Sequence, residues 1–236
     1  MSLHVTVHGQ GKSLVLLHGW GFDGYIWQAL IPALTARFTL YVVDLPGFGQ
    51  SENMDWDAFK QTLLQALPPD FAVAGWSLGG LFATRLAVEA PSRITHVLNI
   101  TATPRFLQDD DWPGVESSVL AAFLDDVMLF PERTWKRFTR LQGIEHAILP
   151  PRVGWSGLRA GLDVLQTWDL RALLPQLNMP VCYAFGPLDG IISPTLMPCM
   201  QARYPMFHYH WFQDAAHTPF LSHPGEFLTL LDEFLI

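Results

Sequence analysis

Gly75-Trp76-Ser77-Leu78-Gly79-Gly80 directly follows the apolar run Phe71-Ala72-Val73-Ala74 and precedes a helical run at 81–87. A serine in a G-x-S-x-G pattern between a buried strand and a helix is typical of a nucleophile elbow. The sharp turn exposes the Ser77 hydroxyl and directs the Leu78 N–H into the same space. Glycines on both sides let the strand and the helix approach closely. The sequence therefore predicts a nucleophilic serine on a strand–turn–helix unit.

Short apolar runs alternate with longer amphipathic runs on both sides of this turn. The pattern predicts strands at 13–17, 40–43, 71–74, 96–100, 181–185 and 207–212. It predicts helices at 25–37, 56–67, 81–87, 196–202 and 226–235. Strands that alternate with helices form a mostly parallel sheet with helices on both faces. We therefore expect an α/β fold.

The alternation stops between residues 104 and 173, where the sequence favours helices and contains no convincing strand. Pro113-Gly114 and Pro150-Pro151 interrupt this stretch. A helical insertion between two sheet strands is typical of a lid, although helices that only add packing fit the same pattern. We expect a core formed by residues 1–103 and 174–236 and a helical lid formed by residues 104–173.

Composition narrows the class of protein. Apolar residues make up 50% of the 236 residues and charged residues 15%, which favours one folded domain over disorder. The net charge of −8 argues against non-specific binding to nucleic acid. The sequence contains no recognisable signal peptide or membrane-length apolar run. Cys182 and Cys199 lack a redox or metal-binding spacing. We expect a cytoplasmic monomer without a metal or cofactor.

Serine is a weak nucleophile unless a base removes its proton, so a histidine and an acid should accompany Ser77. In an open parallel sheet, active groups gather at the carboxyl ends of the strands. Asp189 lies in the loop after strand 181–185, and His217 lies in the loop after strand 207–212. The order serine, aspartate, histidine is the one expected after a nucleophile elbow. We predict that His217 accepts the Ser77 proton and that Asp189 orients the imidazole.

Other residues compete for these roles. Asp214 is an alternative acid, but it would share the loop of His217 rather than brace it from the neighbouring strand. His223 is an alternative base, but it precedes a proline at the expected entry to the last helix. His18 precedes Gly19 at a strand end, where we expect it to organise a loop.

A tetrahedral intermediate carries a negative oxygen that needs hydrogen-bond donors. The first donor is the N–H of Leu78, and the second is expected from the loop after the first core strand. This loop contains Trp20 between two glycines, which allow its backbone to turn inward. We predict the Trp20 N–H as the second donor. Its side chain would contact either the substrate or the core.

Four segments together resemble the α/β-hydrolase superfamily. They are Leu16-Leu17-His18-Gly19-Trp20-Gly21, Asp44-Leu45-Pro46-Gly47-Phe48-Gly49-Gln50-Ser51, the elbow, and Ala215-Ala216-His217. Within this superfamily, the tryptophans at positions 20 and 76 resemble those of the pimeloyl-[acyl-carrier protein] methyl ester carboxylesterases of biotin synthesis. The resemblance covers nearly the whole chain and implies the α/β-hydrolase fold with an inserted helical lid.

The resemblance also implies an activity, namely hydrolysis of the methyl ester of pimeloyl-[acyl-carrier protein] to the free carboxylate and methanol in biotin biosynthesis. The implied partner is acyl carrier protein, and the lid would hold the carrier and the acyl chain. The implied acyl-contacting residues are Phe138, Thr139, Arg140, Leu141 and Gln142. The later segment 143–161 departs from the family pattern, because it is shorter and differently composed.

Charge supports the same partner independently. Between residues 133 and 159 there is one acid, Glu145, and there are six basic residues, namely Arg133, Lys136, Arg137, Arg140, Arg152 and Arg159. The first four fall within an arc of about 100° on a helix. A basic stripe on an acidic chain attracts an acidic protein, although a solvated helix face explains it equally well. We expect carrier docking at Arg133, Lys136 and Arg137.

Other functions stay open at this point. A broad-specificity short-chain carboxylesterase would use the same residues, as would a lyase or carbon–carbon hydrolase of the menaquinone-pathway type. A non-catalytic binding protein with this fold is a fourth hypothesis. It is disfavoured because Ser77, Asp189 and His217 are all present.

Overall fold

The computed structural model describes residues 2–144 and 154–236. In this part of the chain, seven strands form one sheet in the order β1-β3-β2-β4-β5-β6-β7. The strands are β1 (Val5–Gly9), β2 (Lys12–Leu17), β3 (Phe38–Val43), β4 (Phe71–Trp76), β5 (Ile94–Ile100), β6 (Val181–Phe185) and β7 (His208–Trp211). β1 is antiparallel to β3, and the other neighbouring pairs are parallel. The predicted α/β fold with a mostly parallel sheet is confirmed.

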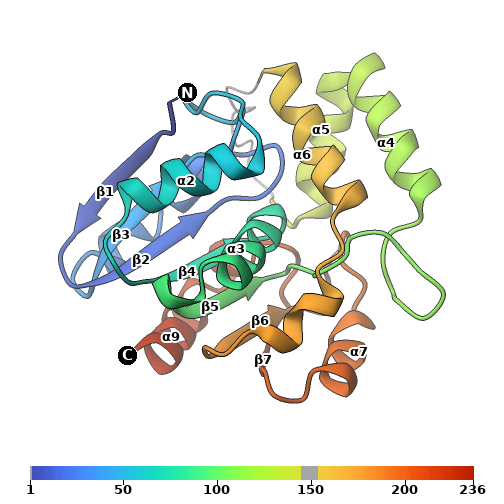
Figure 1. Ribbon diagram of the computed structural model, residues 1–236. Coiled ribbons are helices and arrows are strands. Elements are labelled where there is room, and N and C mark those ends of the chain that lie inside the picture. The colour runs from blue at the N-terminus through green and yellow to red at the C-terminus, as the bar shows by residue number, and fades with distance from the viewer. Residues whose placement is uncertain (1, 145–153) are drawn as a thin grey trace.

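Helices cover both faces of this sheet, because successive strand residues point to opposite sides. Val15 and Leu17 pack in one core with helices α2 (Trp56–Ala66), α3 (Leu78–Glu89) and α7 (Leu196–Arg203). Leu14 and Leu16 pack in the other core with η1 (Gly24–Trp27), α1 (Ile31–Leu34), α8 (Pro219–Ser222) and α9 (Pro224–Leu235). Figure 1 shows α2 and α3 in front of the sheet and α9 behind it.

The prediction of one helix at 25–37 was wrong, because two short elements, η1 and α1, occupy this stretch. The Asp23 carboxylate accepts a hydrogen bond from the Tyr25 N–H and begins the first turn. Pro32 then follows at the start of α1. Proline has no N–H to donate to the preceding turn, so a continuous helix cannot pass through it. The pattern also missed β1, a five-residue strand at the sheet edge that is half exposed.

The stretch that interrupts the alternation contains α4 (Ser117–Leu129), α5 (Pro131–Leu141) and α6 (Trp155–Thr167). We call these three the lid helices. Figure 1 shows them gathered beside one another at one side of the sheet. Among the described residues between 104 and 173, the extended pairing is limited to isolated bridges such as Arg105 with Asp169. Two 3-10 turns, η2 (Pro91–Arg93) and η3 (Arg171–Gln176), complete the elements. No helix in the described ranges is long and apolar enough to span a membrane.

Candidate active site

Ser77 lies in the tight turn between β4 and α3. Its backbone has φ 54° and ψ −115°, a conformation that is rare for residues other than glycine. The turn is fixed because the Ser77 N–H donates to the Ile100 carbonyl at 2.9 Å and its own carbonyl accepts the Gly80 N–H at 2.9 Å. A Cβ at Gly75 would overlap the carbonyl of Gly79. The strained serine at this turn is therefore held by main-chain bonds and by close backbone packing.

Asp189 and His217 form a buried pair on the loops after β6 and β7. The two atoms His217 Nδ1 and Asp189 Oδ2 are 2.7 Å apart, and the side chains are only 1% and 2% exposed. The second oxygen, Asp189 Oδ1, accepts the N–H groups of Ile191 and Ile192 at 2.8 and 2.9 Å. An aspartate held in this way keeps the proton of the imidazole on Nδ1. His217 Nε2 is then free to accept a proton.

The alternative acid and base, Asp214 and His223, pair with each other elsewhere on the surface. Asp214 Oδ1 and His223 Nε2 are 2.7 Å apart, and the side chains are 78% and 23% exposed. Water screens such a pair, so it contributes little electrostatic orientation. Burial therefore favours Asp189 and His217, rather than Asp214 and His223, as the acid and base that serve Ser77.

The main chain of His217 is anchored to the end of the sheet that bears Ser77. Trp76 Nε1 and Thr101 Oγ1 both donate to the His217 carbonyl, each at 2.8 Å. Thr101 follows β5 directly and has a φ of 43°. Sequence reasoning did not single out Thr101, since no local signal connects two residues that lie far apart in the chain.

The loop after β2 carries His18 and Trp20, and the structure defines the protonation of the histidine. The Leu45 N–H donates to His18 Nε2 at 2.9 Å, so this nitrogen carries no proton. The other nitrogen, Nδ1, therefore donates to the Gly19 carbonyl at 2.8 Å. Burial lowers the pKa of His18 and favours the neutral ring. Because a peptide unit is planar, fixing the Gly19 carbonyl also fixes the direction of the Trp20 N–H.

Ser77 borders an apolar cavity of about 360 Å³ beneath the lid helices. Its lining includes Trp20, Leu120, Phe123, Phe138, Leu141, Leu162 and Leu165. Of the five residues predicted to contact an acyl chain, Phe138 and Leu141 line this cavity. The Thr139 hydroxyl donates to the Trp135 carbonyl, and Arg140 is exposed. Gln142 is buried, and its main-chain carbonyl accepts the Thr218 hydroxyl at 2.9 Å.

The basic stripe lies on α5 and is partly paired. Arg133 and Arg137 are 70% and 75% exposed, and each lies 3.8 Å from a carboxylate oxygen of Asp126 on α4. Lys136 is exposed. The charge count from the sequence missed Asp126, because this acid precedes the counted segment. Arg152 and Glu145, which that count included, lie outside the described residues.

Within residues 2–144 and 154–236, no group of three or more histidine, cysteine, aspartate or glutamate side chains is arranged to hold a metal ion. The thiol of Cys182 is buried in the sheet, and burial raises its pKa to about 12. Both cysteines are free.

The chain belongs to the α/β-hydrolase family, since residues 14–230 match the model of that family. The resemblance found in the motifs is thereby confirmed.

Solved structures share the fold at low sequence identity. An esterase from Exiguobacterium antarcticum superposes with a TM-score of 0.90 at 20% identity, covering 98% of this chain and 94% of that chain. An enol-lactonase from Burkholderia xenovorans LB400 superposes with a TM-score of 0.82 at 18% identity, covering 99% of this chain and 96% of that one.

Curated relatives are similar over their whole length. A protein from Legionella pneumophila (strain Paris) named pimeloyl-[acyl-carrier protein] methyl ester esterase is 47% identical over 239 residues, covering 100% of both chains. A protein of the same name from Aliivibrio salmonicida is 36% identical over 250 residues, covering 99% of this chain and 96% of that protein.

Proposed function

We propose that this protein is a serine carboxylesterase that hydrolyses the methyl ester of pimeloyl-[acyl-carrier protein] in biotin biosynthesis. The observation that carries this proposal is the 47% identity, over the full length of both chains, to a protein named for that activity. The buried pair Asp189 and His217 and the apolar cavity at Ser77 support the same chemistry.

In the proposed reaction, Ser77 Oγ attacks the ester carbonyl carbon while His217 Nε2 accepts the hydroxyl proton. The carbonyl oxygen becomes an oxyanion that the N–H groups of Leu78 and Trp20 stabilise. Protonated His217 then donates its proton to the departing methoxy oxygen, which releases methanol and leaves an acyl-enzyme. Water, deprotonated by His217, attacks this acyl group, and the return of the proton to Ser77 releases the carboxylate.

The cavity suits a substrate with a flexible apolar chain. Most of its lining consists of leucine, valine and aromatic side chains, whereas Asp126, Thr134 and Arg137 supply polar groups. A chain of methylene groups gains about 0.8 kcal/mol for each buried CH₂, so a cavity of this kind favours a pimeloyl ester over a short one. We assign acyl-chain contacts to Phe138 and Leu141, since Thr139, Arg140 and Gln142 do not line the cavity.

Acyl carrier protein is the proposed partner, and we assign its docking to Arg133, Lys136 and Arg137 on α5. Acidic side chains of a carrier would replace Asp126 as the partner of the two arginines, because the existing pairs are solvent-exposed and 3.8 Å long. Exposed pairs at such a distance contribute about 1 kcal/mol or less. Exchange of one acidic partner for another therefore costs little.

Genetic complementation tests the proposal. The wild-type chain should restore growth without biotin to a bacterial strain that lacks the biotin-pathway methyl esterase, and Ser77→Ala should not. Growth with Ser77→Ala, or no growth with a well-expressed wild type, would contradict the proposal. A broad-specificity short-chain esterase predicts a different result: replacing the three docking residues by Glu would change the hydrolysis of carrier-linked and free esters equally.

A further inference from the structure

The Trp20 side chain contacts all three lid helices. Its ring meets Phe123 of α4 edge to face at 5.4 Å between centroids, and Phe138 of α5 at 5.3 Å. Its Nε1–H donates to the main-chain carbonyl of Leu158 on α6 at 2.8 Å. The indole is nearly completely buried. The residue whose backbone N–H is assigned to the oxyanion thus connects the lid helices to the sheet.

Two glycines let α6 approach the loops after β2 and β3 closely. A Cβ at Gly157 would overlap the carbonyl of Gly47 in the loop after β3. A Cβ at Gly161 would lie 2.7 Å from Trp20 Cδ1 and 3.3 Å from Leu78 Cδ2. These distances leave no room for a methyl group unless its neighbours shift. Helix α6 therefore packs directly against the side chains of both residues assigned to oxyanion binding.

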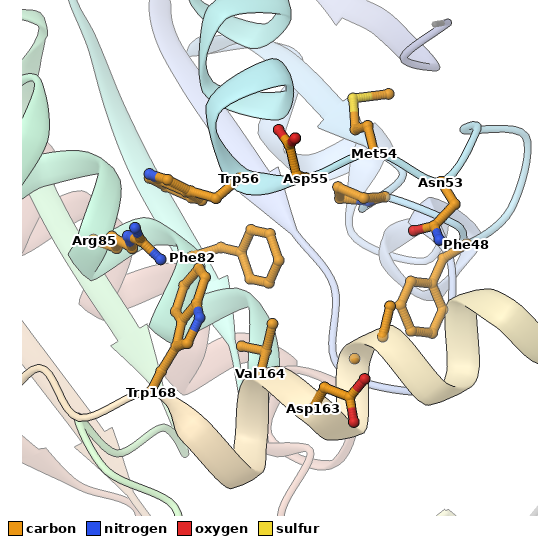
Figure 2. Close-up of a pocket in the computed structure, with 13 residues that line it drawn as sticks. Phe48, Asn53, Met54, Asp55, Trp56, Phe82, Arg85, Asp163, Val164 and Trp168 are labelled. Atoms are coloured by element: carbon orange, nitrogen blue, oxygen red, sulfur yellow. The ribbon is translucent and has the colours of Figure 1, made fainter.

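The core-facing residues Leu162 and Leu165 of α6 are buried, and a cavity borders the helix along Asp163 and Val164. Figure 2 shows the cavity that borders α6, where Trp168, directly after the helix, packs against Trp56 and Phe82 at 5.3 and 5.1 Å between ring centroids. This cavity has a volume of about 240 Å³. Of the contacts made by α6, the hydrogen bond to Trp20 and the close approach at Gly161 reach the residues assigned to oxyanion binding.

We infer that α6 positions the oxyanion donors through Gly161 and the main-chain carbonyl of Leu158. The inference rests on the proposed function, because it takes the N–H groups of Trp20 and Leu78 as the donors. Displacement of α6 tilts the indole and the backbone that carries it. Donors that are misdirected by this tilt stabilise the oxyanion of the transition state less. Binding of the ester in the ground state changes little. The effect then falls on kcat, with KM nearly unchanged.

The test compares Gly161→Ala with Gly154→Ala on hydrolysis of a short p-nitrophenyl ester. Gly154 precedes the same helix, and a Cβ there meets nothing closer than 3.8 Å. We expect Gly161→Ala to lower kcat about tenfold or more, since loss of one whole donor costs about 100-fold to 1,000-fold. KM should change less than about twofold, and an alkyl boronic acid, which mimics the tetrahedral intermediate, should bind more weakly by the factor lost in kcat.

Trp20→Phe provides a second variant, because it keeps the backbone N–H and an aromatic ring but loses the donor to Leu158. It should also lower kcat and weaken boronic acid binding by the same factor, whereas its KM is not diagnostic because the Trp20 ring lines the cavity. If either folded variant retains the kcat and the boronic acid affinity of the wild type, the inference is overturned and the proposed esterase activity stands. If the wild type hydrolyses neither the p-nitrophenyl ester nor the carrier-linked ester, the proposed function fails and the inference fails with it.

Discussion

Replacing Asp189 by asparagine reverses a hydrogen bond without changing the shape of the side chain. Asp189 Oδ1 accepts two main-chain N–H groups, from Ile191 and Ile192. The amide oxygen of the asparagine must take this place, so its NH₂ group faces His217 Nδ1, which lies 2.7 Å from Asp189 Oδ2 in the wild type. The imidazole must then accept on Nδ1 and carry its proton on Nε2, which can no longer remove the Ser77 proton. Loss of the correct tautomer costs about 10⁴ in kcat, or about 5.4 kcal/mol of transition-state stabilisation.

Steady-state hydrolysis of a p-nitrophenyl ester measures this loss, and thermal unfolding shows whether the variant is folded. Asp214→Asn is the matched control, because Asp214 also pairs with a histidine at 2.7 Å but is exposed. We expect its kcat to stay within about twofold of the wild type. If the kcat of Asp189→Asn stays within about tenfold of the wild type, or if Asp214→Asn loses as much, Asp189 does not set the tautomer of His217.

Three further changes have defined outcomes. Gly75→Ala should lower the free energy of unfolding by about 3 kcal/mol, measured in urea, because its methyl group overlaps the Gly79 carbonyl. A second prediction concerns pH. Because the pKa of His18 is lowered in the folded protein, its ring stays neutral there, whereas in the unfolded chain the same ring binds a proton more readily. Stability should therefore fall as pH drops below about 6.5, and His18→Gln should show a shallower fall in denaturant titrations. Asp126→Asn should lower KM for the carrier-linked ester about twofold, and KM for a p-nitrophenyl ester should change less, although Asp126 also lines the cavity; a KM that changes equally for both esters, or for neither, contradicts carrier docking at Arg137.

Local signals account for the part of the fold that was predictable from the sequence. The elbow glycines, the short apolar runs and the strand-end loops lie within a few residues of the features they indicate. The wrong helix at 25–37 shows the limit of periodicity, because apolar spacing continues through a stretch where Pro32 cannot donate a helical hydrogen bond. β1 is short and half exposed, so it lacks the apolar run that marks the inner strands.

Contacts in the candidate site that join distant parts of the chain could not be predicted. The Thr101 hydroxyl reaches the His217 carbonyl across 116 positions, and the Trp20 indole reaches the Leu158 carbonyl across 138. Asp126 lies on a different helix from the basic stripe, so only the packing of α4 against α5 reveals the pairing. The pairing of Asp214 with His223 likewise emerges only in three dimensions.

Mass spectrometry of the carrier conjugate follows the proposed ester hydrolysis itself. Purified wild-type protein is incubated with pimeloyl-[acyl-carrier protein] methyl ester, and the intact mass of the conjugate is followed with time. We expect this hydrolysis to remove one CH₂ from the conjugate as the methyl ester becomes a carboxylate, with the thioester intact and no conversion by Ser77→Ala. An unchanged conjugate, or equal conversion by the Ser77→Ala protein, would contradict it.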